Sequence, residues 1–132
     1  MSKASQYSTV LLNATAALLG YGAWAVYANF EHGQEAWLMA GIVQGVYAFI
    51  STLSITIVAK WIYAKCGRGK MGIFAGFTAS FLVMLAIPFS VHSVAGTPDI
   101  LETILPGLVW GAIYSLGFLI LTERKRLAQG SH

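Results

Sequence analysis

The sequence predicts an all-α integral membrane protein whose four transmembrane helices form a compact up-down bundle. Of its 132 residues, 57% are hydrophobic and only 10% are charged, whereas soluble domains carry about 25% charged residues. The apolar residues gather into four runs of roughly 20, the length at which a helix crosses about 30 Å of hydrocarbon. Almost every charge lies between or after these runs. The chain therefore belongs in a membrane and crosses it four times.

The runs form a single domain, residues 1–129, followed by residues 130–132, which resemble the remnant of a purification tag. The first run contains no ionisable group besides tyrosine, and it is longer than the apolar core of a secretory signal, so we expect it to be retained as a span. The second and third runs are equally free of charge in their centres. Unbroken apolar runs exclude alternating strands, and a helix satisfies its own backbone hydrogen bonds in lipid. The expected spans are residues 7–29, 37–63, 71–91 and 98–122.

The fourth span opens with a pattern typical of a helix start. Thr97 is the expected N-cap, and Pro98 suits the first helical position. Asp99 follows in the first turn, where a carboxylate opposes the positive end of the helix dipole. We therefore expect the last helix to begin near Pro98 and to bend at Pro106.

The charges predict how the chain is oriented. All eight Lys and Arg residues fall on one side of a membrane crossed four times, and four of the five acids fall on the other. The positive-inside rule then places both termini and the middle loop in the cytoplasm. This pattern predicts a multi-pass protein of the cell inner membrane. Because topology explains the net charge of +3, we expect no nucleic-acid partner.

Small residues recur at a spacing of four on three of the spans. Lipid tails are as apolar as the helices, so membrane helices associate through close packing and polar contacts. Ridges of small residues let two helix backbones approach, within the chain, between copies in a homo-oligomer, or inside a larger membrane complex. The residues are Gly41 and Gly45, then Gly72, Gly76 and Ser80, and finally Gly107, Gly111 and Ser115.

A short internal similarity accompanies these ridges. Residues 41–47 read GIVQGVY and residues 107–114 read GLVWGAIY, with both glycines and the valine in register. Each segment opens a span that follows an acidic loop. If this is a duplication, the protein consists of two helical hairpins related as parallel repeats, an arrangement known among transporters.

Uncharged polar residues are the best candidates for function inside the membrane. No Asp, Glu, Lys, Arg or His is expected near the centre of a span, which counts against a proton-coupled antiporter. The first span carries Asn13, and the second carries Gln44, Tyr47, Ser51 and Ser54 along one face. Two interpretations remain open: this face lines a path for a substrate, or it supplies hydrogen bonds between helices.

Imidazoles and carboxylates gather on the predicted outer side, and both are ligands for divalent metals. Two histidines there would also suit axial ligation of a haem. Their spacing matches no metal motif, and solvation of the loops explains the same residues, so we expect no cofactor. The weak candidates are His32, His92, Glu31, Glu35, Asp99 and Glu102.

Two functional hypotheses follow, and neither is an enzyme, because the sequence contains no known catalytic motif. The first is an oligomeric transport or permeation module for a small solute or lipid, without proton coupling. The second is an accessory or assembly subunit of a larger membrane complex, with no chemistry of its own; metal or haem binding is a third, weaker alternative. Membrane lipids are expected partners in every case. The polar face favours transport, since an accessory role does not explain it.

Overall fold

The computed structural model describes residues 3–130, with side chains from residue 11 onward. Within that range the protein is all-helical, with no strand, and each long helix is apolar enough to cross a membrane. This confirms the predicted all-helical class with four long apolar helices, and it is consistent with a multi-pass membrane protein. Ser131 and His132 of the predicted tag remnant lie outside the described residues. The elements are α1 (Lys3–Ala28), the short 3-10 helix η1 (Phe30–His32), α2 (Gln34–Lys65), α3 (Gly69–Val94) and α4 (Ile100–Gln129).

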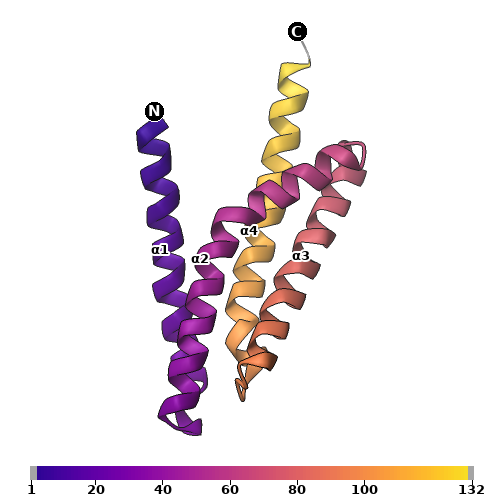
Figure 1. Cartoon of the computed structure of the whole chain (residues 1–132). Helices are drawn as coiled ribbons and strands as arrows, with labels where there is room; N and C mark the ends of the chain where they lie inside the picture. Colours follow the sequence, from indigo (N-terminus) through magenta and orange to yellow (C-terminus); the bar gives the residue numbers. More distant parts are fainter. Residues whose placement is uncertain (1–2, 131–132) are drawn as a thin grey trace.

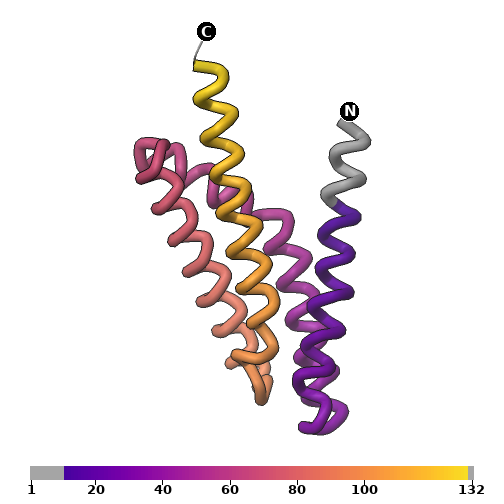
Figure 2. Tube along the Cα trace, turned by 180° about the vertical axis from the view of Figure 1, so that it is seen from behind, coloured from indigo at the N-terminus to yellow at the C-terminus, as the bar shows by residue number. Residues whose placement is uncertain are grey.

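The helices form two hairpins that run alternately up and down (Figure 1). The turns from α1 to α2 and from α3 to α4 lie at one end, which we call the outer end after the orientation predicted from the charges. The two chain ends and the turn from α2 to α3 lie at the opposite, inner end. Viewed from behind, α4 lies between α1 and α3 (Figure 2). The first and last helices are therefore neighbours across the bundle.

The helix α2 bends part-way along, so that its beginning packs on α1 and its end leads toward α3 (Figure 1). Hydroxyls in the middle of α2 account for the bend. Thr52 Oγ1 and Ser51 Oγ donate to Ala48 O at 2.7 and 3.1 Å, and Ser54 Oγ donates to Ile50 O at 2.8 Å. Hydroxyls that bond to the preceding helical turn bend helices. The hydroxyls of Ser51 and Ser54, both on the predicted polar face, thus form hydrogen bonds within their own helix.

Glycines bring α1 and α2 into backbone contact. A Cβ atom added at Gly45 would lie 2.9 Å from Leu18 O, and one added at Gly41 would lie 3.2 Å from Gly22 O. At the other end of α2, a Cβ at Gly72 would lie 2.8 Å from Tyr63 O. Because no side chain separates these backbones, the helices approach as the predicted ridges require. The sequence reasoning did not include Gly22, which supplies the α1 side of this contact.

The remaining ridge residues pack inside the same chain. A Cβ at Gly76 would lie 3.0 Å from Ala59 O, and one at Gly111 would lie 2.5 Å from Met84 Sδ. Ser80 and Ser115 are buried, with hydroxyls bonded to carbonyls of their own helices. Gly107 faces the Gln44 amide. All eight predicted packing residues therefore have neighbours within a single copy.

The predicted start of the fourth helix is wrong by two residues. The helix begins at Ile100, with Asp99 rather than Thr97 at the N-cap position and without a side-chain cap. The Thr97 hydroxyl is instead directed toward the buried His92 ring, where its oxygen lies 2.8 Å from Nδ1. At its other end the helix continues to Gln129, beyond the apolar run.

A carboxylate ties three helices together at the inner end. Glu123 of α4 accepts hydrogen bonds from the Tyr63 hydroxyl of α2 and from Arg126, whose guanidinium reaches both carboxylate oxygens at 2.6 and 2.8 Å. The backbone of Gly69, at the start of α3, adds a further hydrogen bond to this carboxylate. Beneath it, Ala59, Tyr63 and Leu119 form the buried core. Glu123 is the one acid that the charge pattern placed on the basic side, and these contacts explain its position.

Glu123→Gln should therefore lower the midpoint of SDS-induced unfolding, because the variant keeps the shape of the side chain but loses the charge that pairs with Arg126. Tryptophan fluorescence in mixed micelles measures the midpoint. Glu31→Gln is the matched control, since Glu31 is exposed and has no bonded partner in the described part of the chain. Equal midpoints for the two variants would contradict a structural role for Glu123.

Candidate functional site

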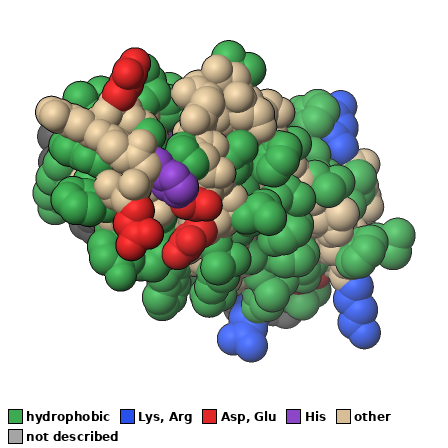
Figure 3. Space-filling model, turned by 90° about the horizontal axis from the view of Figure 1, so that it is seen from below, with side chains coloured by type: hydrophobic (Ala, Val, Ile, Leu, Met, Phe, Trp, Pro, Cys, Tyr) green, Lys and Arg blue, Asp and Glu red, His purple; other side chains and the backbone are tan. Residues whose placement is uncertain are grey.

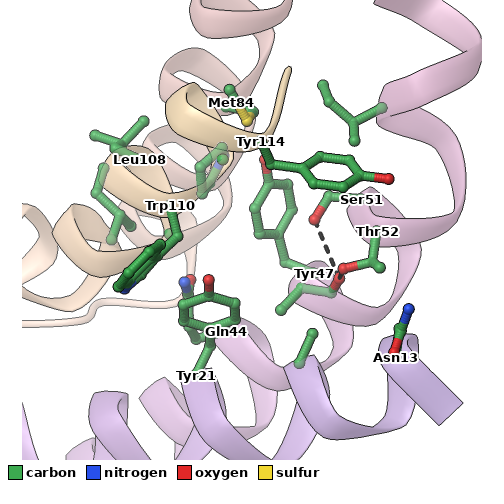
Figure 4. Close-up of a pocket in the computed structure, with 17 residues that line it drawn as sticks. Asn13, Tyr21, Gln44, Tyr47, Ser51, Thr52, Met84, Leu108, Trp110 and Tyr114 are labelled. Atoms are coloured by element: carbon green, nitrogen blue, oxygen red, sulfur yellow. Dashed lines mark hydrogen bonds between the residues drawn. The ribbon is translucent and has the colours of Figure 1, made fainter. Parts of the chain in front are cut away.

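A cavity of about 430 Å³ lies between α1, α2 and α4, with α3 contributing Met84 and Pro88. Its lining mixes small apolar residues with uncharged polar and aromatic side chains, which come from three helices (Figure 4). On α2 the polar lining extends from Gln44 to Thr52, which is about 12 Å along the helix axis. The polar and aromatic residues are Asn13, Tyr21, Gln44, Tyr47, Ser51, Thr52, Trp110 and Tyr114.

The cavity opens to the side. Trp110 and Tyr114 line it but are 62% and 56% exposed, and Asn13 on the opposite wall is also exposed. The deeper wall is closed, because Gln44 is only 1% exposed. The site is therefore a pocket between α1 and α4 whose mouth faces the surroundings of the bundle, and its floor is α2.

The structure brings together four of the five residues of the predicted polar face. Asn13, Gln44, Tyr47 and Ser51 line this cavity. Ser54 lies instead on a second, almost entirely apolar groove of about 440 Å³ between α2 and α3. Tyr47, Ser51 and Ile55 line both spaces, so the two adjoin along α2.

Sequence reasoning missed the aromatic half of the lining. Tyr21 follows Asn13 by eight residues, which places both on one face of α1. Trp110 and Tyr114 are four residues apart on α4, directly beside the ridge that was assigned to packing. That spacing was the available signal, but an aromatic pair at spacing four is equally typical of a lipid-facing surface. Only the position of α1 beside α4 distinguishes the two.

A buried histidine supports the cavity from behind. His92 is 0% exposed, its Nε2 lies 2.9 Å from Gln44 Oε1, and its Nδ1 lies 2.8 Å from Thr97 Oγ1. A neutral imidazole satisfies both contacts, with Nε2–H donating to Gln44 and Nδ1 accepting from the Thr97 hydroxyl. Both ring nitrogens are thus in use, and neither is free to ligate a metal or a haem. His92 holds the Gln44 amide in place against the cavity.

A second buried polar group joins α1 to the start of α4. Asn29 is 0% exposed, and its amide nitrogen donates to Ala25 O at 2.9 Å and to Thr103 Oγ1 at 2.7 Å. Its Oδ1 accepts from the backbone N–H of Asp99 at 3.1 Å. Nearby, Trp24 Nε1 donates to Glu102 O at 2.9 Å. The outer ends of α1 and α4 are therefore held together by hydrogen bonds.

Acidic side chains and a histidine gather on the outer surface (Figure 3). His32 Nε2 lies 2.5 Å from Asp99 Oδ2, and both side chains are more than two-fifths exposed. Glu31 and Glu102 line the same shallow depression, whereas Glu35 does not. Across the described residues, no three His, Cys, Asp or Glu side chains are grouped so that they could hold a metal ion. Of the six metal candidates, His92 is bonded to Gln44 inside the bundle, and His32 and Asp99 are paired with each other on the surface. The side chains of Glu31, Glu35 and Glu102 belong to neither pair in the described part of the chain.

This arrangement can hold an uncharged polar group at mid-depth of the bundle. The outer ends of the helices close one side of the cavity, and the gap between α1 and α4 leaves it open on another.

The chain matches no family model, and no similar curated protein or solved structure was found.

Proposed function

We propose that this protein is a small transport or permeation module that moves a small solute or a lipid through its membrane. The observation that carries the proposal is the 430 Å³ cavity, which combines hydroxyls, amides and aromatic rings in helices that otherwise consist mostly of hydrocarbon. Ligand sites are typically cavities of a few hundred Å³ with a few placed polar groups. Interhelical hydrogen bonding alone does not explain a cavity of this size lined by polar and aromatic side chains.

The proposal does not include proton coupling or catalysis. The cavity lining contains no Asp, Glu, Lys, Arg or His. A carrier that exchanged protons for substrate would need a titratable group in contact with the substrate. The uncharged lining therefore supports passive movement of the substrate down its gradient.

The orientation belongs to the proposal as well. Both chain ends lie at the same end of the bundle as the α2–α3 turn (Figure 1), and that turn carries Lys65, Arg68 and Lys70. Under the positive-inside rule this end faces the cytoplasm. We accordingly propose an inner-membrane protein with cytoplasmic termini, whose closed outer end faces away from the cytoplasm.

The two hairpins are proposed to be parallel repeats. Gly45 of α2 packs on Leu18 of α1, and Gly111 of α4 packs on Met84 of α3. In each hairpin the second helix therefore uses its second ridge glycine to contact the first helix, as a duplication requires. We also propose that copies associate. Because the ridge residues are used within the chain, this association would use other, lipid-facing side chains.

Flux measurements on proteoliposomes test the function. Stopped-flow light scattering follows the entry of glycerol, and dithionite bleaching follows the transbilayer exchange of a fluorescent monoglucosyl lipid. At least one probe should cross about tenfold faster than in protein-free vesicles, a difference of ~1.4 kcal/mol in the barrier. If neither probe crosses faster, transport is refuted and the accessory-subunit hypothesis takes its place.

A matched pair of variants on α4 links the flux to the cavity. Gly107 lines the cavity, and a Cβ there would meet only Gln44 Nε2 at 3.5 Å, so Gly107→Leu fills space without moving a backbone. Gly117 faces open space and is outside the lining, so Gly117→Leu is the control. We expect Gly107→Leu to abolish most of the added flux and Gly117→Leu to preserve it. Gln44→Leu is unsuitable, because it would leave the buried Nε2–H of His92 without a partner.

A further inference from the structure

We infer that the cavity binds the headgroup of an uncharged, hydroxyl-bearing lipid, which enters sideways from the bilayer between α1 and α4. This inference rests on the proposed function and names its substrate class. Three properties of the structure carry it: the charge of the lining, the polar side chains that have no partner among the described side chains, and the position of the entrance.

The cavity lining disfavours a charged ligand. None of the 17 side chains that line the cavity is Asp, Glu, Lys, Arg or His. The nearest imidazole is His92, which lies behind Gln44 and is bonded to it. A phosphate or ammonium group in this space would lose its hydration without gaining a counter-charge, which is costly within a membrane. The headgroup is therefore uncharged.

The polar side chains match hydroxyl groups. Tyr21, Tyr114 and Trp110 form no side-chain hydrogen bond with any residue between 11 and 130, although they face a common space (Figure 4). A tyrosine hydroxyl both donates and accepts, whereas the indole only donates. A ligand with several hydroxyls supplies both roles and also offers C–H surfaces to the aromatic rings. A glycosylated lipid has this chemistry.

The entrance faces lipid. A second crevice of about 420 Å³ runs between α1 and α4 and shares Ala17, Tyr21 and Trp110 with the cavity. Small residues of α1 line it, including Ala16 and Gly20, opposite Pro106 of α4. Trp24 lines the crevice and bonds to Glu102 O of α4, which closes the crevice toward the outer end. A hydrocarbon tail fits between these small side chains while its headgroup occupies the cavity, whereas a water-soluble ligand would have to enter through lipid.

Photolabelling of the full-length protein in lipid nanodiscs tests this assignment. The probe is a monoglucosyl diacylglycerol with a diazirine in one acyl chain, and peptide mass spectrometry locates the labelled residues. Labels should concentrate on α1 and α4 along the crevice, and excess unlabelled monoglucosyl diacylglycerol should displace them. Phosphatidylglycerol and free glucose should not. Labels spread evenly over all lipid-facing helices, or displaced equally by phosphatidylglycerol, would overturn the proposal. Displacement by glucose would show that the site binds a free sugar and would overturn the assignment of a lipid ligand.

Matched tyrosine variants place the headgroup. Tyr47→Phe combined with Tyr114→Phe removes two hydroxyls from the cavity and should raise the competitor concentration for half-displacement about tenfold. Tyr27→Phe is the control, because Tyr27 is 72% exposed at the outer end and does not line the cavity. Equal displacement in both variants would overturn the headgroup position. Selective labelling without flux would refute transport but keep the binding site, whereas glycerol flux without selective labelling would refute the substrate class alone.

Discussion

Gly45→Leu should destabilise the protein more than any other single change described above. A Cβ at this position already lies 2.9 Å from the Leu18 carbonyl oxygen and 3.7 Å from Gly22 Cα. A backbone atom cannot rotate away as the end of a side chain can, so α1 and α2 must separate. Overpacking of this kind costs about 1–3 kcal/mol and sometimes more. SDS titration followed by circular dichroism measures the free energy of unfolding.

Gly20→Leu is the matched control for this change. Gly20 lies on the same hairpin, but a Cβ there would have no neighbour within 4 Å. We expect its unfolding free energy to remain within about 0.5 kcal/mol of the parent protein, as for other surface substitutions. If the two leucine variants proved equally stable, the close contact between α1 and α2 would be contradicted.

Asn29→Leu should have the second-largest effect, because it removes the buried link between α1 and α4. The change deletes hydrogen bonds to Thr103 Oγ1 and to the Asp99 backbone N–H, and it leaves that N–H without a partner. An orphaned buried donor costs about 1–3 kcal/mol, and interhelical hydrogen bonds in membranes contribute about 0.6 kcal/mol each. We therefore expect a loss of about 1–3 kcal/mol in the same SDS titration.

Asn13→Leu provides the comparison on the same helix. Asn13 is exposed at the mouth of the cavity, and its amide bonds to no other side chain or carbonyl in the described range. Its replacement should leave the unfolding free energy unchanged, since an amide that faces lipid contributes little to stability. A loss in Asn13→Leu as large as that in Asn29→Leu would show that the outer link is not the cause.

The helices and their packing ridges were predictable because both follow from local properties of the chain. Four apolar runs bounded by charges predict four spans, and glycines at spacing four predict close contacts. The start of α4 was mispredicted for a non-local reason. Thr97 has the right chemistry for an N-cap, but its hydroxyl is directed toward the buried His92 of the preceding helix, and Asp99 stands at the N-cap position.

The candidate site was predictable only in part. Gln44, Tyr47 and Ser51 could be found because they share one face of a single helix. Their grouping with Tyr21 and Trp110 depends on which helices are neighbours, and spacing along the chain does not encode that. The sequence does not show which serine hydroxyls line the cavity either. Ser54 has the same side chain as Ser51, but Ser51 lines both the cavity and the apolar groove, whereas Ser54 lines only the groove.

The sequence by itself determined that this chain is helical and apolar enough to span a membrane four times. The reason is that a lipid bilayer requires each spanning segment, taken separately, to be apolar and to satisfy its own backbone hydrogen bonds. The tertiary structure alone decided which polar groups serve the fold and which face a cavity. Asn29, His92 and Glu123 each form a hydrogen bond with a side chain of a different helix, whereas Tyr21, Trp110 and Tyr114 line the cavity. That division depends on distances between helices, which are set when the glycine ridges bring their backbones together.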